Sequence, residues 1–457
     1  MDWFPYPIKN IEGDFEYTHR SSDFVQNQVH PSIDIKSFRG SHDNTQVQLK
    51  GAIDWVEVQG AEDWRVHFST MHVDDLIPDR MFRLALPPDL RKVAEELNPQ
   101  GNPVSFSGTF EMRGSTDPSL PVTAGWNMET VLSGTNVWAG VDLEHVRGSV
   151  TSRGIYDGQN VEMTGELDIE SADLWGDYQL TDIQGPYFLV DRYLWVGSVP
   201  QPQRPVSFQI DRNRIRPVTA KAIGGTISLE GNSLIEQETI YKFKIIMENG
   251  LLEEFARLYL PGTHNIKGVI NSWMELQGQG NSPEKIMGKG QLLISPAALY
   301  ELPVFVQMFN ELGGLIPQDK TAFKTAFAEF DISQKQFRFN SIRLQGDSIG
   351  MYGQGTARFD GQLNLDFYSV VPRNNVPIPI VNEVVNEVVS MASRDMVGMK
   401  VRGNINRPVV TFDNAIKRLF DSIPVRDAIR SPAMLVPPFS FPNQQFSPPA
   451  GTGRPGN

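Results

Sequence analysis

Val161-Glu-Met-Thr-Gly-Glu-Leu-Asp-Ile-Glu170 places an apolar residue or glycine at every odd position and a polar residue at every even one. Successive side chains of a β-strand point to opposite faces, so this period of two predicts a strand with one face in water and the other buried or covered by lipid. At about 3.3 Å per residue, ten residues span about 33 Å, which is long for a strand of a globular protein. We therefore expect long strands whose sheet has one apolar and one polar face.

A second pattern repeats along the chain: a glycine between two apolar residues of one strand. It occurs at Leu49–Ile53, Phe106–Phe110, Met163–Leu167 and Val401–Ile405, and paired glycines follow at 278/280, 288/290 and 353/355. Glycine weakens a strand, and its repeated use indicates bends, bulges or strong curvature at fixed places. The alternative is that these glycines mark the hairpin ends of an ordinary β protein.

Composition narrows the class of protein. The chain has 457 residues, 39 glycines, 32 prolines and 40% hydrophobic residues, which favours many short strands with turns over long helices. A net charge of −13 and the lack of any run of four Lys or Arg argue against a nucleic-acid partner. Without cysteine there is no disulfide, thiolate metal site or cysteine nucleophile. The sequence has no run of 18 apolar residues, so no membrane span is predicted, and residues 1–7 lack the features of a signal peptide.

No motif predicts catalysis. Gly346–Gly350 matches the nucleophile-elbow string around Ser348, but the residues after it are poor helix formers, and the last histidine, His264, precedes it. Ser282–Lys285 matches Ser-x-x-Lys without the companion motifs, and the seven histidines lack zinc spacing. We predict no enzyme activity, no metal and no cofactor. A β-rich hydrolase with carboxylates paired in space is the weaker alternative.

Helices are expected near residues 251–260, 297–312 and 380–396. The second would place one apolar stripe over the sheet, either as the cover of its end or as a plug or membrane-facing element. Pro303 lies inside it and should kink or break it. The stripe, taken as a groove-covering helix, consists of Leu299, Leu302, Val306, Phe309 and Leu312.

An ordered series of strings resembles the C-terminal region of AsmA-like proteins, the group that includes TamB. The match is clearest over residues 250–412 and looser before them. Its strings are Gly268-x-Ile270, Leu276-x-Gly278-x-Gly280, Gly288-x-Gly290-x-Leu292-x-Ile294, Leu302-Pro303, Phe309-x-x-Leu312, Phe330 to Phe339, Leu344-x-Gly346, Gly353-x-Gly355, Leu363-x-Leu365 and Val401-x-Gly403-x-Ile405-x-x-Pro408.

The resemblance implies an elongated, strongly curved antiparallel β-sheet, a trough or half-barrel with a few short amphipathic helices, as in bridge-like lipid-transfer proteins. It divides the chain into a groove region at 1–250 and an AsmA-like region at 251–425, before a Pro-rich tail at 431–457 predicted to be disordered. Members of the family begin with a transmembrane anchor. We therefore expect a periplasmic or cell-envelope location, with anchoring through a segment missing from this chain.

The implied function is non-enzymatic binding and transfer of phospholipid or another acyl lipid between the inner and outer membranes in support of outer-membrane biogenesis. An envelope protein is a further candidate partner. Each CH₂ group of an acyl chain that the groove removes from water would contribute about 0.8 kcal/mol to lipid binding. The alternative is an assembly factor for outer-membrane proteins that offers sheet edges to a partner strand. The predicted groove residues are Met163, Leu167, Ile169, Leu292, Ile294, Phe337, Phe339, Leu363, Leu365 and Phe367.

Overall fold

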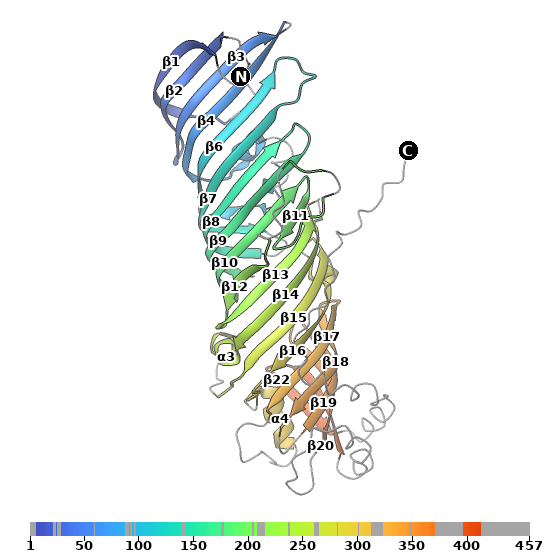
Figure 1. The fold of residues 1–457 in the computed structure, drawn as a ribbon. Coiled ribbons are helices and arrows are strands. Elements are labelled where there is room, and N and C mark those ends of the chain that lie inside the picture. The colour runs from blue at the N-terminus through green and yellow to red at the C-terminus, as the bar shows by residue number, and fades with distance from the viewer. Residues whose placement is uncertain are drawn as a thin grey trace. The chain divides into compact units, whose positions relative to one another are not determined.

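The computed structural model confirms a mainly β protein, and the 22 strands of its described residues belong to one antiparallel sheet (Figure 1). Two compact units can be distinguished by their internal contacts. The described residues up to 221, with those of 228–242, form the N-terminal unit, and 222–227 with those from 243 onward form the C-terminal unit. The structure describes residues 6–21, 24, 29–58, 60–86, 91, 94–95, 97–138, 142–174, 178–202, 205–207, 215–235, 238–259, 265–280, 282–299, 301–311, 323–346, 350–370 and 396–412.

The N-terminal unit is a meander of long strands in which each main strand pairs with the next along the chain. The Val161 stretch extends to a strand of 14 residues. The strands are β1 (Lys9–Ser21), β2 (Val29–His42), β3 (Thr45–Val58), β4 (Ala61–Leu76), β5 (Gln100–Gly101), β6 (Val104–Ser115), β7 (Thr123–Trp138), β8 (Asp142–Tyr156), β9 (Val161–Leu174), β10 (Tyr178–Val190) and β11 (Tyr193–Val196).

The strands that follow lead into and form the C-terminal unit, where β15 to β22 again pair in sequence order. They are β12 (Val218–Ala222), β13 (Gly225–Leu234), β14 (Ile240–Leu251), β15 (Val269–Gln279), β16 (Met287–Ile294), β17 (Thr325–Ser333), β18 (Gln336–Gln345), β19 (Gly350–Arg358), β20 (Gln362–Val370), β21 (Met396–Asn404) and β22 (Arg407–Phe412).

β-Bulges adjust which sequence positions face the apolar side. In β2 the pairing with β3 jumps between Ile35 and Phe38, and in β18 the pairing with β19 jumps between Phe339 and Ile342. An extra residue in one strand reverses the odd–even alternation beyond it. The apolar residues change from odd to even positions at these same places, so the bulges keep them on one face.

Helices are short among the described residues: α1 (Arg80–Ala85), α3 (Leu252–Tyr259), α4 (Pro303–Glu311) and the 3-10 turn η1 (Pro283–Lys285). α3 matches the helix expected at 251–260. The prediction of a helix over 297–312 was wrong at its start. Ala297 and Ala298 form isolated β-bridges, and α4 begins at Pro303. Proline lacks an N–H and fits the first turn of a helix, where no intrahelical partner is needed, rather than its interior.

Two further predictions fall almost wholly outside the described residues. Of the helix expected at 380–396, the structure describes Met396, which begins strand β21. The predicted tail, 431–457, lies beyond the described ranges.

Candidate functional site: an apolar face of the sheet

Cross-strand register gathers apolar residues of the N-terminal unit on one face of its sheet. Directly paired residues of antiparallel strands share a face. Leu167 of β9 pairs with Val150 of β8, and Met163 pairs with Leu189 of β10. The same face carries, among others, Ile33, Ile35, Phe38, Leu49, Ile53, Val66, Phe68, Met71, Phe106, Phe110, Met112, Trp126, Met128, Leu132, Ile169 and Tyr187.

The opposite face is polar along β9. On β9 it carries Glu166 and Asp168, which pair with Thr151 and Ser149 of β8, respectively. Gln184 of β10 donates a hydrogen bond to Asp168 at 3.1 Å. The alternation seen in the sequence at 161–170 therefore separates two surfaces of opposite polarity, as expected.

The apolar face of this unit is only partly covered. Near one end of the strands, α1 packs Phe82 and Ala85 against Val73, Leu76 and Val104. Farther along, many of the apolar side chains are neither fully buried nor fully exposed. These half-buried residues are Phe38, Leu49, Phe68, Met71, Phe106, Phe110, Trp126, Met128, Val150, Met163 and Leu167.

Aromatic rings lie over glycines on this face. Tyr187 of β10 covers Gly165 of β9, and a β-carbon at Gly165 would come within 2.7 Å of the ring and 1.9 Å of the Thr151 carbonyl oxygen. The Tyr187 hydroxyl donates to that carbonyl oxygen at 3.0 Å. Burial raises the pKa of Tyr187 above its ordinary value, so the hydroxyl stays protonated. Some of the strand glycines thus serve close packing of strands and rings, which neither sequence interpretation specified.

The C-terminal unit has an equivalent apolar face, and the seven predicted groove residues of this unit share it. Leu365 pairs with Val401, and Phe367 pairs with Met399. Leu292 and Ile294 of β16 pair with Ala328 and Ala326 of β17, which in turn pair with β18. Phe337 and Phe339 lie on that face of β18, and Leu363 lies on it in β20.

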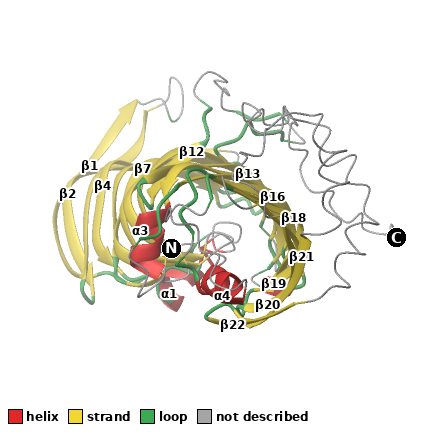
Figure 2. Cartoon of the chain, turned by 90° about the horizontal axis from the view of Figure 1, so that it is seen from below, coloured by secondary structure: helices red, strands yellow, loops and turns green. Residues whose placement is uncertain are grey.

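In this unit the chain fills its own apolar face. The strands curve round α4, whose Phe305 and Met308 are buried in a cluster with Leu252, Phe323 and the sheet residues (Figure 2). Leu363, Leu365, Phe367 and Ile294 are core residues here. Leu292, Phe337 and Phe339 remain half-buried.

The predicted helical stripe is only partly realised. Leu299 is buried and Leu302 packs against the cluster, but both precede α4. Val306 is on the helix and is exposed, whereas Phe305 and Met308 point inward. The stripe assumed a helix from residue 297, and a later start rotates the inward face. The Phe309 side chain and Leu312 lie outside the described residues.

A buried ionic network lies on the polar face near the start of the chain. Asp54 receives two hydrogen bonds from Arg65, at 3.0 and 2.8 Å, and one from Arg20 at 3.2 Å. Burial favours the neutral carboxyl, but the hydrogen bonds from Arg65 and the charges of Arg65 and Arg20 outweigh it, so the pKa of Asp54 is lowered. Phe24 lies over the Arg65 guanidinium at 5.3 Å. The network links β1 to β4.

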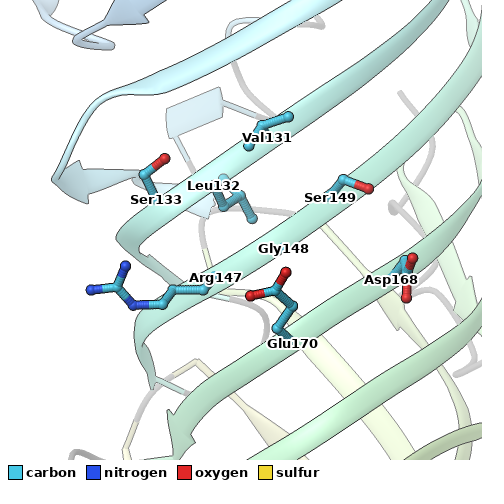
Figure 3. A pocket seen from close by; sticks show the side chains of 8 residues that line it. All are labelled: Val131, Leu132, Ser133, Arg147, Gly148, Ser149, Asp168 and Glu170. Carbon is cyan, nitrogen blue, oxygen red and sulfur yellow. The ribbon is translucent and has the colours of Figure 1, made fainter.

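A shallow hollow of about 350 Å³ lies on the polar side of β7 to β9 (Figure 3). Arg147, Asp168 and Glu170 supply its charges, and Ser133 and Ser149 supply hydroxyls. Within the described ranges, no group of three His, Asp or Glu side chains is placed to hold a metal ion. The lining of this hollow is mainly polar and charged, so the apolar face is the stronger candidate for the functional site.

Comparisons with protein-family models, curated proteins and solved structures returned no match. In the described part of the chain, none of the helices has the length and apolar character needed to span a membrane. The resemblance to AsmA-like proteins stays a prediction.

Sequence reasoning missed several residues of the apolar face. Phe68, Phe110, Trp126 and Met128 alternate with polar neighbours in their strands, and this signal was sufficient to find them. α1 was not found, because its six residues are too few to show helical periodicity.

Proposed function

We propose that this chain is a non-enzymatic lipid-binding and lipid-transfer protein whose acyl-chain site is the apolar face of its N-terminal unit. The observation that carries the proposal is the row of half-buried apolar side chains across neighbouring strands, backed by a polar face. A core would bury these side chains fully beneath a second layer. A surface that binds acyl chains needs them accessible, contiguous and without directional polar anchors.

The dimensions suit acyl chains. Strands in a sheet lie about 4.8 Å apart, so the eight main strands from β2 to β10 extend the face over about 34 Å. The hydrocarbon core of a whole bilayer is about 30 Å thick. The face is therefore long enough for two acyl chains placed end to end, with headgroups beyond its edges in water.

The proposal assigns different roles to the predicted residues. Met163 and Leu167 are half-buried and contact lipid directly. Leu363, Leu365 and Phe367 instead form the core that α4 covers. This division changes the earlier expectation of one groove lined by all ten residues. Location at the cell envelope, transfer between its two membranes and a role in outer-membrane biogenesis rest on the AsmA-like resemblance and belong to the same proposal.

Native mass spectrometry of the purified chain, followed by lipid extraction, tests the proposal. We expect bound phospholipids, and we expect Leu167→Asp to lower their occupancy at least about tenfold, since a charge in an acyl site loses several kcal/mol. Asn127→Asp adds the same charge on the exposed polar face of β7 and should leave occupancy unchanged. A lipid-free chain that takes up no fluorescent lipid, or equal occupancy in both variants, contradicts the proposal.

A second candidate is an assembly factor that binds a partner by strand addition. Strand β1 favours it, because its first nine residues are exposed and its apolar Phe15 and Tyr17 are about half exposed. A partner strand would continue the sheet there. Crosslinking from Tyr17 to an outer-membrane protein, unaffected by Leu167→Asp, would support this candidate over lipid binding.

A further inference from the structure

Helix α1 presents apolar side chains to solvent on the side away from the sheet. Phe82 and Ala85 pack against the apolar face, whereas Met81 and Leu84, three residues apart and thus neighbours on one helix side, are 44% and 48% exposed. Ile77, just before the helix, is 53% exposed. We define Ile77, Met81 and Leu84 as the α1 tip.

Three arginines surround the α1 tip. Arg80 is exposed, and Arg83 donates to the carbonyl oxygen of Pro78 at 2.9 Å. Arg91 donates to the carbonyl oxygens of Leu84 and Leu86 at 2.7 and 3.1 Å. None of the three forms an ion pair with a carboxylate in the described part of the chain.

Asp79 is the single carboxylate among residues 77–86, and it caps the helix by accepting from the Phe82 N–H at 2.8 Å. The α1 tip therefore combines unpartnered apolar side chains with excess positive charge in a chain whose net charge is −13. Apolar side chains beside arginines are the composition of segments that lie in the interface of a membrane with anionic lipids.

We propose that the α1 tip docks on the surface of a lipid bilayer that carries anionic headgroups. Met81, Leu84 and Ile77 enter the headgroup–acyl boundary, and the exposed Arg80 faces lipid phosphates, while Arg83 and Arg91 add positive charge close to the helix. The surface is distinct from the acyl-chain site, and its purpose rests on the proposed function: because Phe82 and Ala85 contact the apolar face, docking brings a membrane to the edge of that face.

Flotation of the full chain with phosphatidylcholine vesicles, with and without phosphatidylglycerol, tests the docking surface. We expect binding to the phosphatidylglycerol vesicles that weakens with salt. Met81→Asp with Leu84→Asp should lower binding at least about tenfold, as two inserted apolar groups become charges. Val131→Asp with Val409→Asp is the matched control, because these residues are 42% and 58% exposed on strands and lie outside α1. Equal binding by wild type and the α1 variant, or equal loss in both variants, overturns the inference.

Arg80→Glu gives an independent test that does not depend on how well the double variant folds, because the Arg80 side chain is exposed. It should reduce binding to phosphatidylglycerol vesicles about tenfold and leave the melting temperature unchanged. Unchanged vesicle binding contradicts the inference.

The two proposals can fail separately. If wild-type chain floats with vesicles but carries no lipid in native mass spectrometry, the docking surface stands and the acyl-chain site fails. If the α1 variant loses both its bound lipid and its vesicle binding, the α1 tip lines the acyl-chain site, and the docking inference is overturned.

Discussion

The Trp126 indole lies across Gly154 of the neighbouring strand, so closely that a β-carbon at Gly154 would stand 2.2 Å from Cζ2 of the ring. Tyr187 over Gly165 and Phe367 over Gly353 repeat the arrangement. A ring laid on a glycine covers the exposed backbone of a weak strand position. In each pair a large ring packs closely against the backbone of the glycine in the neighbouring strand.

Replacing such a glycine should therefore destabilise the fold. Gly165→Ala would place its β-carbon 1.9 Å from the Thr151 carbonyl oxygen, a backbone atom that can move only with its strand. We expect a loss of about 1–3 kcal/mol in the free energy of unfolding, measured by chemical denaturation. Gly125→Ala is the control, since its nearest neighbour would be 3.9 Å away, and it should be neutral or slightly stabilising. Equal losses would show that glycine content, rather than ring packing, matters.

The two apolar faces should respond differently to the same charge. Leu365 is 6% exposed and pairs with the fully buried Val401, so Leu365→Asp buries an uncompensated carboxylate. We expect a loss of about 4 kcal/mol or more, seen as unfolding at room temperature by circular dichroism. Leu167→Asp, at a half-buried position, should leave the chain folded. A well-folded Leu365→Asp variant would show that the C-terminal face is open.

The buried ionic network should make stability depend on pH. The pKa of Asp54 is lowered in the folded chain, so the unfolded chain binds this proton at higher pH than the folded one. The stabilisation is therefore fully present above the ordinary pKa of 3.8 and is lost as pH falls through the lower folded value. Asp54→Asn should flatten thermal stability over this acidic range. If the variant and the wild type showed the same dependence of melting temperature on pH, Asp54 would not be the group that links stability to pH.

Arg65→Met tests the same network at neutral pH. It removes the guanidinium that donates twice to Asp54 and leaves Arg20 as the remaining donor of the two arginines. We expect a loss of about 3 kcal/mol in the free energy of unfolding, the lower end for a broken buried ion pair. The double variant Arg65→Met, Asp54→Leu should recover part of it, because it leaves no unpaired charge at Asp54.

Helix α4 offers a comparison between neighbouring positions. Met308 is fully buried against the sheet, and Met308→Ala should cost about 2–5 kcal/mol by leaving a cavity. Val306 is 38% exposed, and Val306→Ala should change stability by less than about 0.5 kcal/mol. Thermal melts of both variants measure which substitution lowers stability more. The opposite order would restore the originally predicted stripe.

The polarity of the two sheet faces was predictable because it depends on local alternation, which residues 161–170 display fully. The bulges at Ile35–Phe38 and Phe339–Ile342 lie opposite Gly51 and the glycine pair 353/355, where repeated glycine indicated bends, bulges or curvature, but the strand that carries each extra residue was not predicted.

What covers each face could not be derived from alternation. Leu167 and Leu365 occupy equivalent sequence patterns, yet one is half-buried and the other lies in a core. The difference comes from Phe305, Met308 and Phe323, which reach the second face from far along the chain. Such long-range packing leaves no periodic signal near Leu365.

The half-buried apolar face also links ligand content to stability and solubility. A ligand that binds the folded chain alone raises its stability by about 2.7 kcal/mol at a hundredfold excess over its dissociation constant. Without a ligand, the same side chains from Phe38 to Leu167 become a large wetted patch, which promotes association between molecules. A preparation stripped by detergent and one kept with its lipids should therefore differ in melting temperature and in aggregation, although their sequences are identical.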